Sequence, residues 1–460
     1  MKKTSSSFRY QGVFRWIRVA CFVIALCYAV RAPALTWYVA TNGNDTTHSG
    51  TNGWTNAFLT ISNAVSSSSS GDEIWVAAGE YILDATISNP VDKDIHLLGM
   101  NGPDATIING NSNQAMCVLN GCVGGFTITN GFTTGDQFVR GSDDGAGVYL
   151  HNAIMTNCII TGNSAFVGGG VAVVSGGVLS NCTVRGNQAR AMLVHGKGGG
   201  GIYISGGQVR NCRIENNTSI NHGGGVYIYA NDEIGVLSHS MISNNTAGGN
   251  GGGVLSSAGS ACLSYLTIYD NTASGDGLYT GGGVSLAQHA HMTNCLIYGN
   301  QAPNGCGGGV SFLHKGVIDS CTIVGNTADK GGGISTYWAA AAGWDMFIQN
   351  SIIYSNTATT DGFNWYNALN GHAWFTNCCI TNATMPPGSA LITDCPQFVD
   401  FAADNFRLML NSPCINTGIN MDWMAGALDL DGRRRLDRWS RQVDMGAYEF
   451  LFRGMMIGVY

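Results

Sequence analysis

The sequence predicts an all-β fold, a single-stranded right-handed parallel β-helix of roughly 10–12 coils. Three observations predict it: a recurring phrase Cys-x-Ile-x-x-Asn, a run of glycines after most copies, and apolar side chains that alternate with a period of two. Successive Asn positions are 24 to 30 residues apart, which is too short a unit to enclose its own core. Each unit must therefore stack on its neighbours. The Asn positions are Asn163, Asn187, Asn217, Asn245, Asn271, Asn300, Asn326 and Asn356.

Each repeat is expected to supply at least two short strands separated by turns. The Cys position and the residue two further on, as in Cys212 and Ile214, place both side chains on one face of a strand. The segment after each glycine run has the same spacing, as in Ile202 and Ile204. Coils that rise about 4.8 Å each would make a rod on the order of 50 Å long. These second strands begin at Val171, Ile202, Val226, Val254, Val284, Val310 and Ile334.

Residues 1–34 are expected to be a signal peptide. Basic residues precede the apolar run Val19–Val30, which is too short for a membrane span, and Ala32-Pro33-Ala34 is typical of a cleavage site. The chain is thus predicted to be exported, either extracellular or associated with the cell surface or outer membrane, with no transmembrane insertion of the mature chain. The net charge is −7, and the signal contains six basic residues and no acid. The acidic mature chain argues against a nucleic-acid partner.

Residues 35–144 are expected to form the N-terminal cap and the first, irregular coils. A solenoid needs a cap because an open end exposes core and strand edges. Residues 54–65 can form a short amphipathic helix with Phe58, Ile61 and Val65 on one face. This helix is the predicted N-terminal plug.

Residues 145–394 are expected to be the β-helix repeats. The recurrent Asn predicts an internal ladder of side-chain amides that bond from coil to coil; the alternative is that each Asn caps its own turn. The recurrent Cys position predicts buried, reduced thiols, because parallel Cβ vectors on stacked strands are poorly aimed for a disulfide. The cysteines that we place outside this ladder are the better disulfide candidates: Cys378, Cys379, Cys395 and Cys414.

Residues 395–460 are expected to form a polar, irregular C-terminal capping region. Aspartates interleave there with arginines, which favours ion pairs within the cap. The alternative is that Asp429 and Asp431 bind Ca²⁺ together with Asp422 or Asp444. We predict no metal site and no cofactor, with Ca²⁺ as the open alternative.

Several segments resemble known proteins. The stretch from Trp37-Tyr38-Val39 to Glu80-Tyr81 resembles the start of secreted bacterial right-handed parallel β-helix proteins. Ser412-Pro413-Cys414 and Met445-Gly446-Ala447-Tyr448-Glu449 look like the end of the choice-of-anchor Q subset, and the repeats are similar to those of chlamydial polymorphic outer-membrane proteins. The resemblance covers nearly the whole mature chain. It implies an exported, surface-associated rod.

No catalytic constellation emerges from the sequence. The acid and histidine motifs of polygalacturonase-like enzymes occur in the reverse order and many coils apart, so we assign no catalytic residue. Exposed aromatic rings suit flat sugar faces, and the candidate ligand-binding residues are Tyr203, Tyr227, Trp338 and Trp365. The alternative is that these rings cover core edges or pack under loops. We therefore expect non-enzymatic adhesion or binding of a polysaccharide or surface glycan. The alternative function is a polysaccharide lyase or glycoside hydrolase that acts on an acidic polysaccharide.

Overall fold

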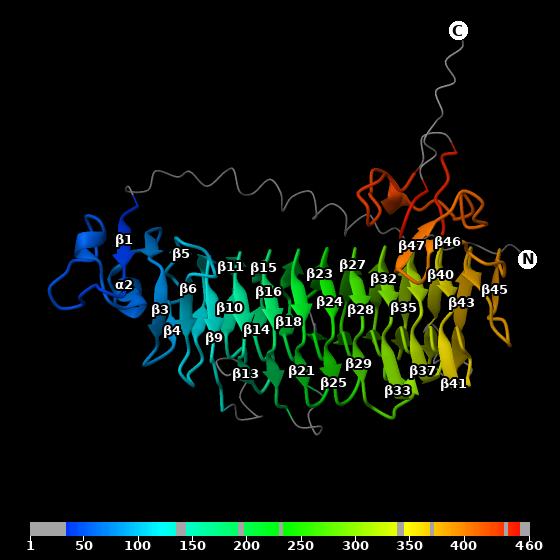
Figure 1. Ribbon diagram of the computed structural model, residues 1–460, viewed down its shortest axis with the longest axis horizontal. Helices are drawn as coiled ribbons and strands as arrows, with labels where there is room; N and C mark the ends of the chain where they lie inside the picture. The colour runs from blue at the N-terminus through cyan, green and yellow to red at the C-terminus, as the bar shows by residue number, and fades with distance from the viewer. Residues whose placement is uncertain are drawn as a thin grey trace, which may run out of the picture.

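The structure is a computed structural model in which stacked coils form a rod (Figure 1). One coil passes through β10 (Val148–His151), β11 (Ala153–Thr156), β12 (Ile159–Thr161) and β13 (Ser164–Ala165). The chain then enters β14 (Val171–Val174), which pairs in parallel with β10 and starts the next coil. The predicted all-β parallel solenoid is therefore confirmed. The described residues are 34–134, 144–191, 197–229, 233–337, 345–368, 372–436 and 440–450.

Equivalent strands of successive coils build four parallel sheets, named A to D. Within the described residues, sheet A has fourteen strands: β1 (Thr36–Val39), β2 (Glu73–Val76), β5 (Ile95–Gly99), β8 (Gly121–Gly124), β11, β15 (Val178–Ser180), β19 (Gln208–Arg210), β23 (Gly235–Ser238), β27 (Ala261–Ser264), β31 (Ala290–Thr293), β35 (Gly316–Asp319), β39 (Met346–Gln349), β43 (Ala373–Thr376) and β45 (Gly388–Ser389). Sheet B follows sheet A in each coil and contains β3 (Gly79–Ile82), β6 (Thr106–Asn109), β9 (Thr127–Thr129), β12, β16 (Thr183–Arg185), β20 (Arg213–Glu215), β24 (Met241–Ser243), β28 (Thr267–Tyr269), β32 (Leu296–Tyr298), β36 (Thr322–Val324), β40 (Ile352–Tyr354) and β44 (Cys379–Ile380).

Sheets C and D complete the coil. Sheet C contains β4 (Ile87–Ser88), β7 (Met116–Val118), β10, β14, β18 (Ile202–Ser205), β22 (Val226–Tyr229), β26 (Val254–Ala258), β30 (Val284–Leu286), β34 (Val310–Phe312), β38 (Ile334–Thr336) and β42 (Trp365–Asn367). Sheet D begins only at β13, and its later strands are β17 (Gln188–Ala189), β21 (Thr218–Ser219), β25 (Thr246–Ala247), β29 (Thr272–Ala273), β33 (Gln301–Cys306), β37 (Thr327–Lys330) and β41 (Thr357–Asp361). Among the described residues, the coils before β13 add no strand to this sheet, and only the isolated bridge between Phe132 and Ser164 extends it.

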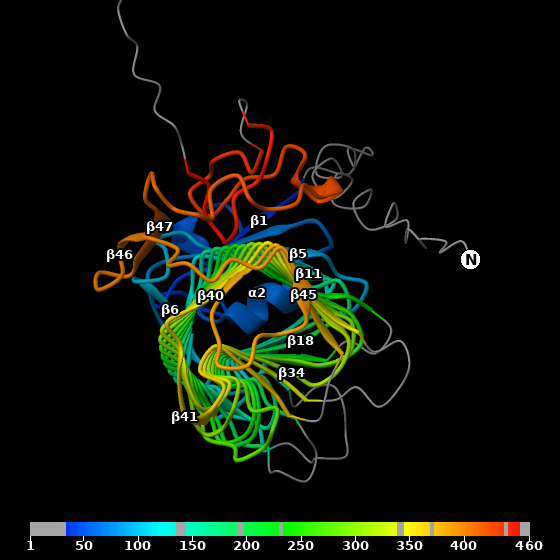
Figure 2. The ribbon, with the colours of Figure 1, turned by 90° about the vertical axis from the view of Figure 1, so that its right-hand side faces the viewer.

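The N-terminal end of the rod is plugged by a short helix. Helix α2 (Ile61–Ser67) buries Ile61, Ala64 and Val65, and it lies across the opening of the coils when the rod is viewed along its axis (Figure 2). The Thr60 hydroxyl caps the helix by accepting a hydrogen bond from the Asn63 amide. The predicted plug is confirmed, but it is shorter than residues 54–65, since the 3₁₀ turn η2 (Trp54–Asn56) and an extended link precede it.

The predicted asparagine ladder is confirmed. Each amide Nδ2 donates to the Oδ1 of the next Asn at 2.9–3.0 Å, from Asn163 to Asn356. The backbone N–H of each Asn donates to the same Oδ1, and Nδ2 also donates to a carbonyl of the preceding coil, as from Asn217 to Val184. These amides are at most 5% exposed. Because they are fully paired, they join the coils without unsatisfied polar groups.

The recurrent cysteine position faces the lumen as a column of buried, unpaired thiols. Five members of this column are buried and free: Cys158, Cys182, Cys212, Cys295 and Cys321. Cys378 was expected to lie outside the column, and this is wrong. It is 0% exposed and its Sγ contacts the Ile348 carbonyl, so it continues the inward position into the next coil. The inward Cys position of the repeat thus continues at Cys378, although this coil has no glycine run.

The C-terminal region, residues 395–450 of the described chain, lies along the flank of the rod (Figures 1 and 2). It contains the antiparallel pair β46 (Phe398–Asp400) and β47 (Asn405–Leu408) and the turn η4 (Asp422–Met424). It packs on the outer face of sheet B and the adjoining corner of sheet A. There the Asn294 amide contacts the Leu428 carbonyl, and Trp423 Nε1 donates to Asp319 at 2.8 Å. The region therefore covers the side of the last coils rather than their open end.

Candidate functional site

The predicted tyrosine column exists, but its ring faces are covered. Tyr203 and Tyr227 are vertical neighbours on the outer face of sheet C, with ring centroids 5.9 Å apart. They are only 9% and 3% exposed, because Val167, Ala191 and Leu255 pack around them in a second apolar cluster. The expectation of exposed rings is wrong here. The alternative, that these rings lie under other segments, is confirmed.

The predicted tryptophan sites also differ from expectation. Trp365 begins β42 and is 6% exposed, because its ring points into the lumen and meets Phe375 edge-on at 5.7 Å. It fills the core of the last coils and offers no surface to a ligand. Trp338 lies outside the described residues.

The acidic residues of the C-terminal region hold backbone turns. The Asp429 carboxylate accepts hydrogen bonds from the amides of Asp431, Arg433 and Glu449 at 2.7–2.9 Å. Arg435, which is fully buried, lies 3.2 Å from Glu449, and Asp431 pairs with Arg407 and Arg433. The predicted ion pairs are thus confirmed. In the described part of the chain, no three His, Cys, Asp or Glu side chains gather to hold a metal ion.

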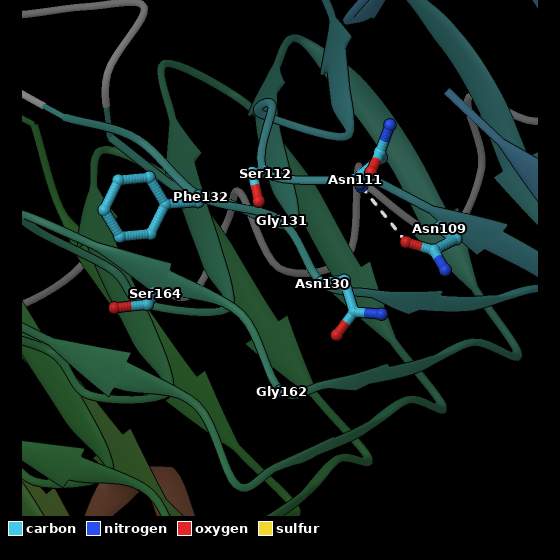
Figure 3. Close-up of a pocket in the computed structure, with 8 residues that line it drawn as sticks. All are labelled: Asn109, Asn111, Ser112, Asn130, Gly131, Phe132, Gly162 and Ser164. Atoms are coloured by element: carbon cyan, nitrogen blue, oxygen red, sulfur yellow. Dashed lines mark hydrogen bonds between the residues drawn. The ribbon is translucent and has the colours of Figure 1, made fainter. Parts of the chain in front are cut away.

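An open pocket of about 350 Å³ lies where sheet D begins. The described residues of the coils through β6 and β9 form no fourth strand, and only Phe132 pairs with β13, through an isolated bridge to Ser164. The chain turns there at Asn111, Ser112 and Asn130, all with positive φ. Asn tolerates this conformation. The turns that line the pocket are therefore built from residues whose side chains can also form hydrogen bonds. The lining residues, shown in Figure 3, are Asn109, Asn111, Ser112, Asn130, Gly131, Phe132, Gly162 and Ser164.

The pocket wall is polar, with one aromatic face. The Asn109 Oδ1 accepts a hydrogen bond from the Asn111 backbone amide at 3.0 Å (dashed in Figure 3), and the Asn109 Nδ2 donates to the Glu80 carboxylate at 2.6 Å. These two bonds fix the orientation of the Asn109 side chain. Asn130 is exposed, and its side-chain amide has no intramolecular hydrogen bond within the described residues. The half-buried Phe132 ring forms the opposite side. The wall therefore offers free and fixed amide groups together with an apolar surface.

A guanidinium lies at the edge of this pocket. The Arg190 guanidinium is 4.3 Å from the centroid of the Phe132 ring, and its Nε donates to Ser164 Oγ at 2.8 Å. The Arg190 Nη2 donates a further hydrogen bond to the Thr133 carbonyl. Among the described residues, no carboxylate pairs with Arg190. Burial lowers the pKa of Arg190, yet the side chain stays charged at neutral pH. A guanidinium that pairs with no carboxylate of the described residues thus adjoins the amide-lined pocket.

Sequence reasoning did not find this pocket. Asn109-Gly110-Asn111-Ser112-Asn113 and Asn130-Gly131 are visible turn signals, but the sequence does not show which coil gains the fourth strand. Arg190 joins the site from a coil more than fifty residues later in the chain than Asn130. A search for the departures from the repeat, rather than for the repeat itself, would have pointed to the first of these segments.

Comparisons with known proteins agree with the observed fold. Residues 194–343 match the sequence profile of the family described as "Right handed beta helix region". No curated protein matches the chain. The fold and this match define a right-handed parallel β-helix repeat protein. The finer resemblance to choice-of-anchor Q and polymorphic outer-membrane proteins stays a prediction.

Similar solved structures include three proteins related to polysaccharides or sugars. Pectate lyase Pel9A is 14% identical, with a TM-score of 0.40 and coverage of 90% of this chain and 96% of that chain. The PL6 family alginate lyase AlyGC is 13% identical, with a TM-score of 0.43 and coverage of 71% and 48%. XylC, solved in complex with xylose, is 9% identical, with a TM-score of 0.47 and coverage of 91% and 99%. Within the described residues, no helix has the length and apolar character needed to span a bilayer.

Proposed function

We propose that this protein is an exported β-helix protein that binds a glycan in the pocket at the start of sheet D. The observation that carries the proposal is the combination of Asn109, Asn111 and Asn130 with the Phe132 ring around one cavity of about 350 Å³. Amide groups pair with sugar hydroxyls, and an aromatic ring packs on the apolar face of a sugar. A cavity of this size lies in the range of small-ligand sites, about 300–1,000 Å³.

Arg190 favours an acidic glycan over a neutral one. Its guanidinium is held by Phe132, Ser164 and the Thr133 carbonyl, so little side-chain freedom is lost when a ligand binds. A carboxylate on a uronic acid would pair with this guanidinium through a charge-assisted hydrogen bond. The chain as a whole is acidic, with a net charge of −7, so such a ligand would bind locally rather than by general attraction.

The test is titration calorimetry of the full chain with oligosaccharides of uronic acids and with neutral oligosaccharides of the same length. We expect Arg190→Gln and Asn130→Ala to weaken uronate binding by about tenfold or more, equivalent to about 1.4 kcal/mol. Arg210→Gln is the matched control, since Arg210 is an exposed arginine on sheet A, away from the pocket. Binding to the uronate should also weaken with added salt.

Two outcomes would contradict the proposal. The first is the absence of binding to every oligosaccharide by the wild-type chain. The second is an equal loss of affinity in the Arg190→Gln and Arg210→Gln variants, which would indicate nonspecific attraction. Release of unsaturated products from the uronate oligosaccharides, abolished by a single substitution, would instead support the alternative lyase function. Export is tested separately, by sequencing the N-terminus of protein recovered outside the cytoplasm, where Leu35 is the expected first residue.

A further inference from the structure

The contact between sheet B and the C-terminal region contains two buried thiols. In β44, Ile380 faces the lumen, whereas Cys379 points outward and joins the apolar cluster between the rod and the C-terminal region. Cys414 belongs to the same cluster. Both side chains are 0% exposed. The two cysteines therefore approach one another from opposite sides of one interface.

The two side chains pack in the same buried cluster. The neighbouring Cys414 thiol, together with burial, raises the pKa of Cys379 well above its ordinary value, and the Cys379 Sγ also lies 3.3 Å from the Asp394 carbonyl. The backbone around Cys414 is fixed, because its amide donates to Ser412 Oγ at 3.2 Å and its carbonyl accepts the Met445 amide at 3.0 Å. The pair thus meets within a well-ordered contact rather than by chance approach of mobile chain.

This arrangement differs from that of the thiols in the lumen. Neighbours such as Cys295 and Cys321 lie on stacked parallel strands, so their Cα–Cβ bonds point the same way. Cys379 and Cys414 come instead from two segments that pack on one another from opposite sides of the interface. The parallel alignment that disfavours a disulfide between stacked strands therefore does not apply to this pair.

We propose that Cys379 and Cys414 form a disulfide that fastens the C-terminal region to the β-helix. The two thiols lose two protons and two electrons, an Sγ–Sγ bond forms, and a disulfide oxidant such as oxidised glutathione or a thiol oxidoreductase is reduced to two thiols. Exchange needs a thiolate, and burial suppresses the thiolate of Cys379. The bond therefore forms during folding, before the C-terminal region covers β44.

The test uses the full chain refolded in a glutathione redox buffer, denatured with an alkylating reagent and then digested without reduction. We expect one linked peptide pair that contains Cys379 and Cys414, with a mass lower by two hydrogen atoms than the sum of the two free peptides. The lumen cysteines and Cys395 should be alkylated. The Cys379→Ser/Cys414→Ser variant should lose the linked pair, and the Cys295→Ser/Cys321→Ser variant is the control that should keep it.

A second measurement does not depend on any variant. Reduction of the wild-type protein should lower the thermal midpoint at which the C-terminal region detaches, measured by hydrogen exchange of peptides from residues 396–436. The proposal is overturned if all four cysteines of residues 378–414 are alkylated as free thiols after refolding under oxidising conditions. It is also overturned if Cys379 is linked to Cys395, which is exposed and nearby in sequence.

Discussion

The side-chain amide of Asn217 lies 2.9 Å from the position that a Cβ atom on Gly201 would occupy. The same relationship recurs between Asn187 and Gly170, at 2.9 Å, and between Asn245 and Gly225, at 3.0 Å. The ladder amide thus fills the space that a side chain at the last glycine of each run would need. This contact explains why the recurrent Asn and the glycine run occur together in the repeats.

Gly201→Ala tests this relationship. Besides the Asn217 amide, the new methyl group would lie 2.8 Å from the Gly225 carbonyl oxygen, closer than van der Waals contact permits. We expect a loss of about 2–3 kcal/mol in the free energy of unfolding, measured by denaturant titration followed by circular dichroism. Gly277→Ala is the control, since its nearest neighbour would be 3.9 Å away. Similar effects of the two substitutions would contradict the steric explanation.

Asn217→Ala should be more damaging than a typical buried truncation. It removes the acceptor of the Asn187 amide groups and the donor to the Val184 carbonyl, so several buried polar groups lose their partners. At about 1–3 kcal/mol for each such group, we expect a loss of about 3 kcal/mol or more. The adjacent Asn216 is exposed and has positive φ, so Asn216→Gly should change stability by less than about 0.5 kcal/mol. A ladder variant as stable as this control would show that the amides contribute little.

Two tryptophans of consecutive strands should respond very unequally to truncation. Trp365→Ala leaves a cavity in the lumen and should cost about 3–5 kcal/mol. Trp374 is 49% exposed, so Trp374→Ala should have a small effect, below about 1 kcal/mol. The measurement is the denaturant midpoint of each variant. Equal midpoints would contradict the inward position of Trp365.

Stability should fall as the pH drops below about 6.5 because of His222. Burial lowers the pKa of His222 to about 4, and its Nδ1 accepts the Asn250 amide at 2.9 Å, which requires the neutral ring. Above its unfolded pKa of about 6.5 this stabilisation is complete; between 6.5 and 4 the unfolded state binds the proton first, so up to about 3 kcal/mol is lost. Melting curves across this range should show a shallower dependence for His222→Asn than for wild type. Asn216→Gly, an exposed change that adds or removes no titratable group, is the control that should keep the wild-type slope.

The repeat residues were sufficient to predict the fold and its interior. Spacing of two at Cys212 and Ile214 correctly places both side chains in the lumen, because a strand has only two faces. The ladder followed from the recurrence of Asn217 and its equivalents, because a polar side chain that recurs at one inward position must find partners in adjacent coils.

The same reasoning failed on the outer surface. The period of two correctly directs Tyr203 and Tyr227 away from the lumen, but it contains no information on what packs outside the sheet. The pocket and the flank position of the C-terminal region depend on contacts between segments far apart in the sequence, such as Arg190 with Phe132 and Trp423 with Asp319. Local pattern does not encode these pairings, so they became visible only in the structure.

The C-terminal region bridges several coils at once. It bonds to Asn294, Asp319, Asn350 and Asn377, which belong to four successive turns of the rod. In a stack held only by contacts between adjacent units, the terminal units can fray one by one. Here the C-terminal region contacts all of these last coils, so they should unfold together rather than one by one. Local unfolding and proteolytic cleavage should therefore begin elsewhere in the rod.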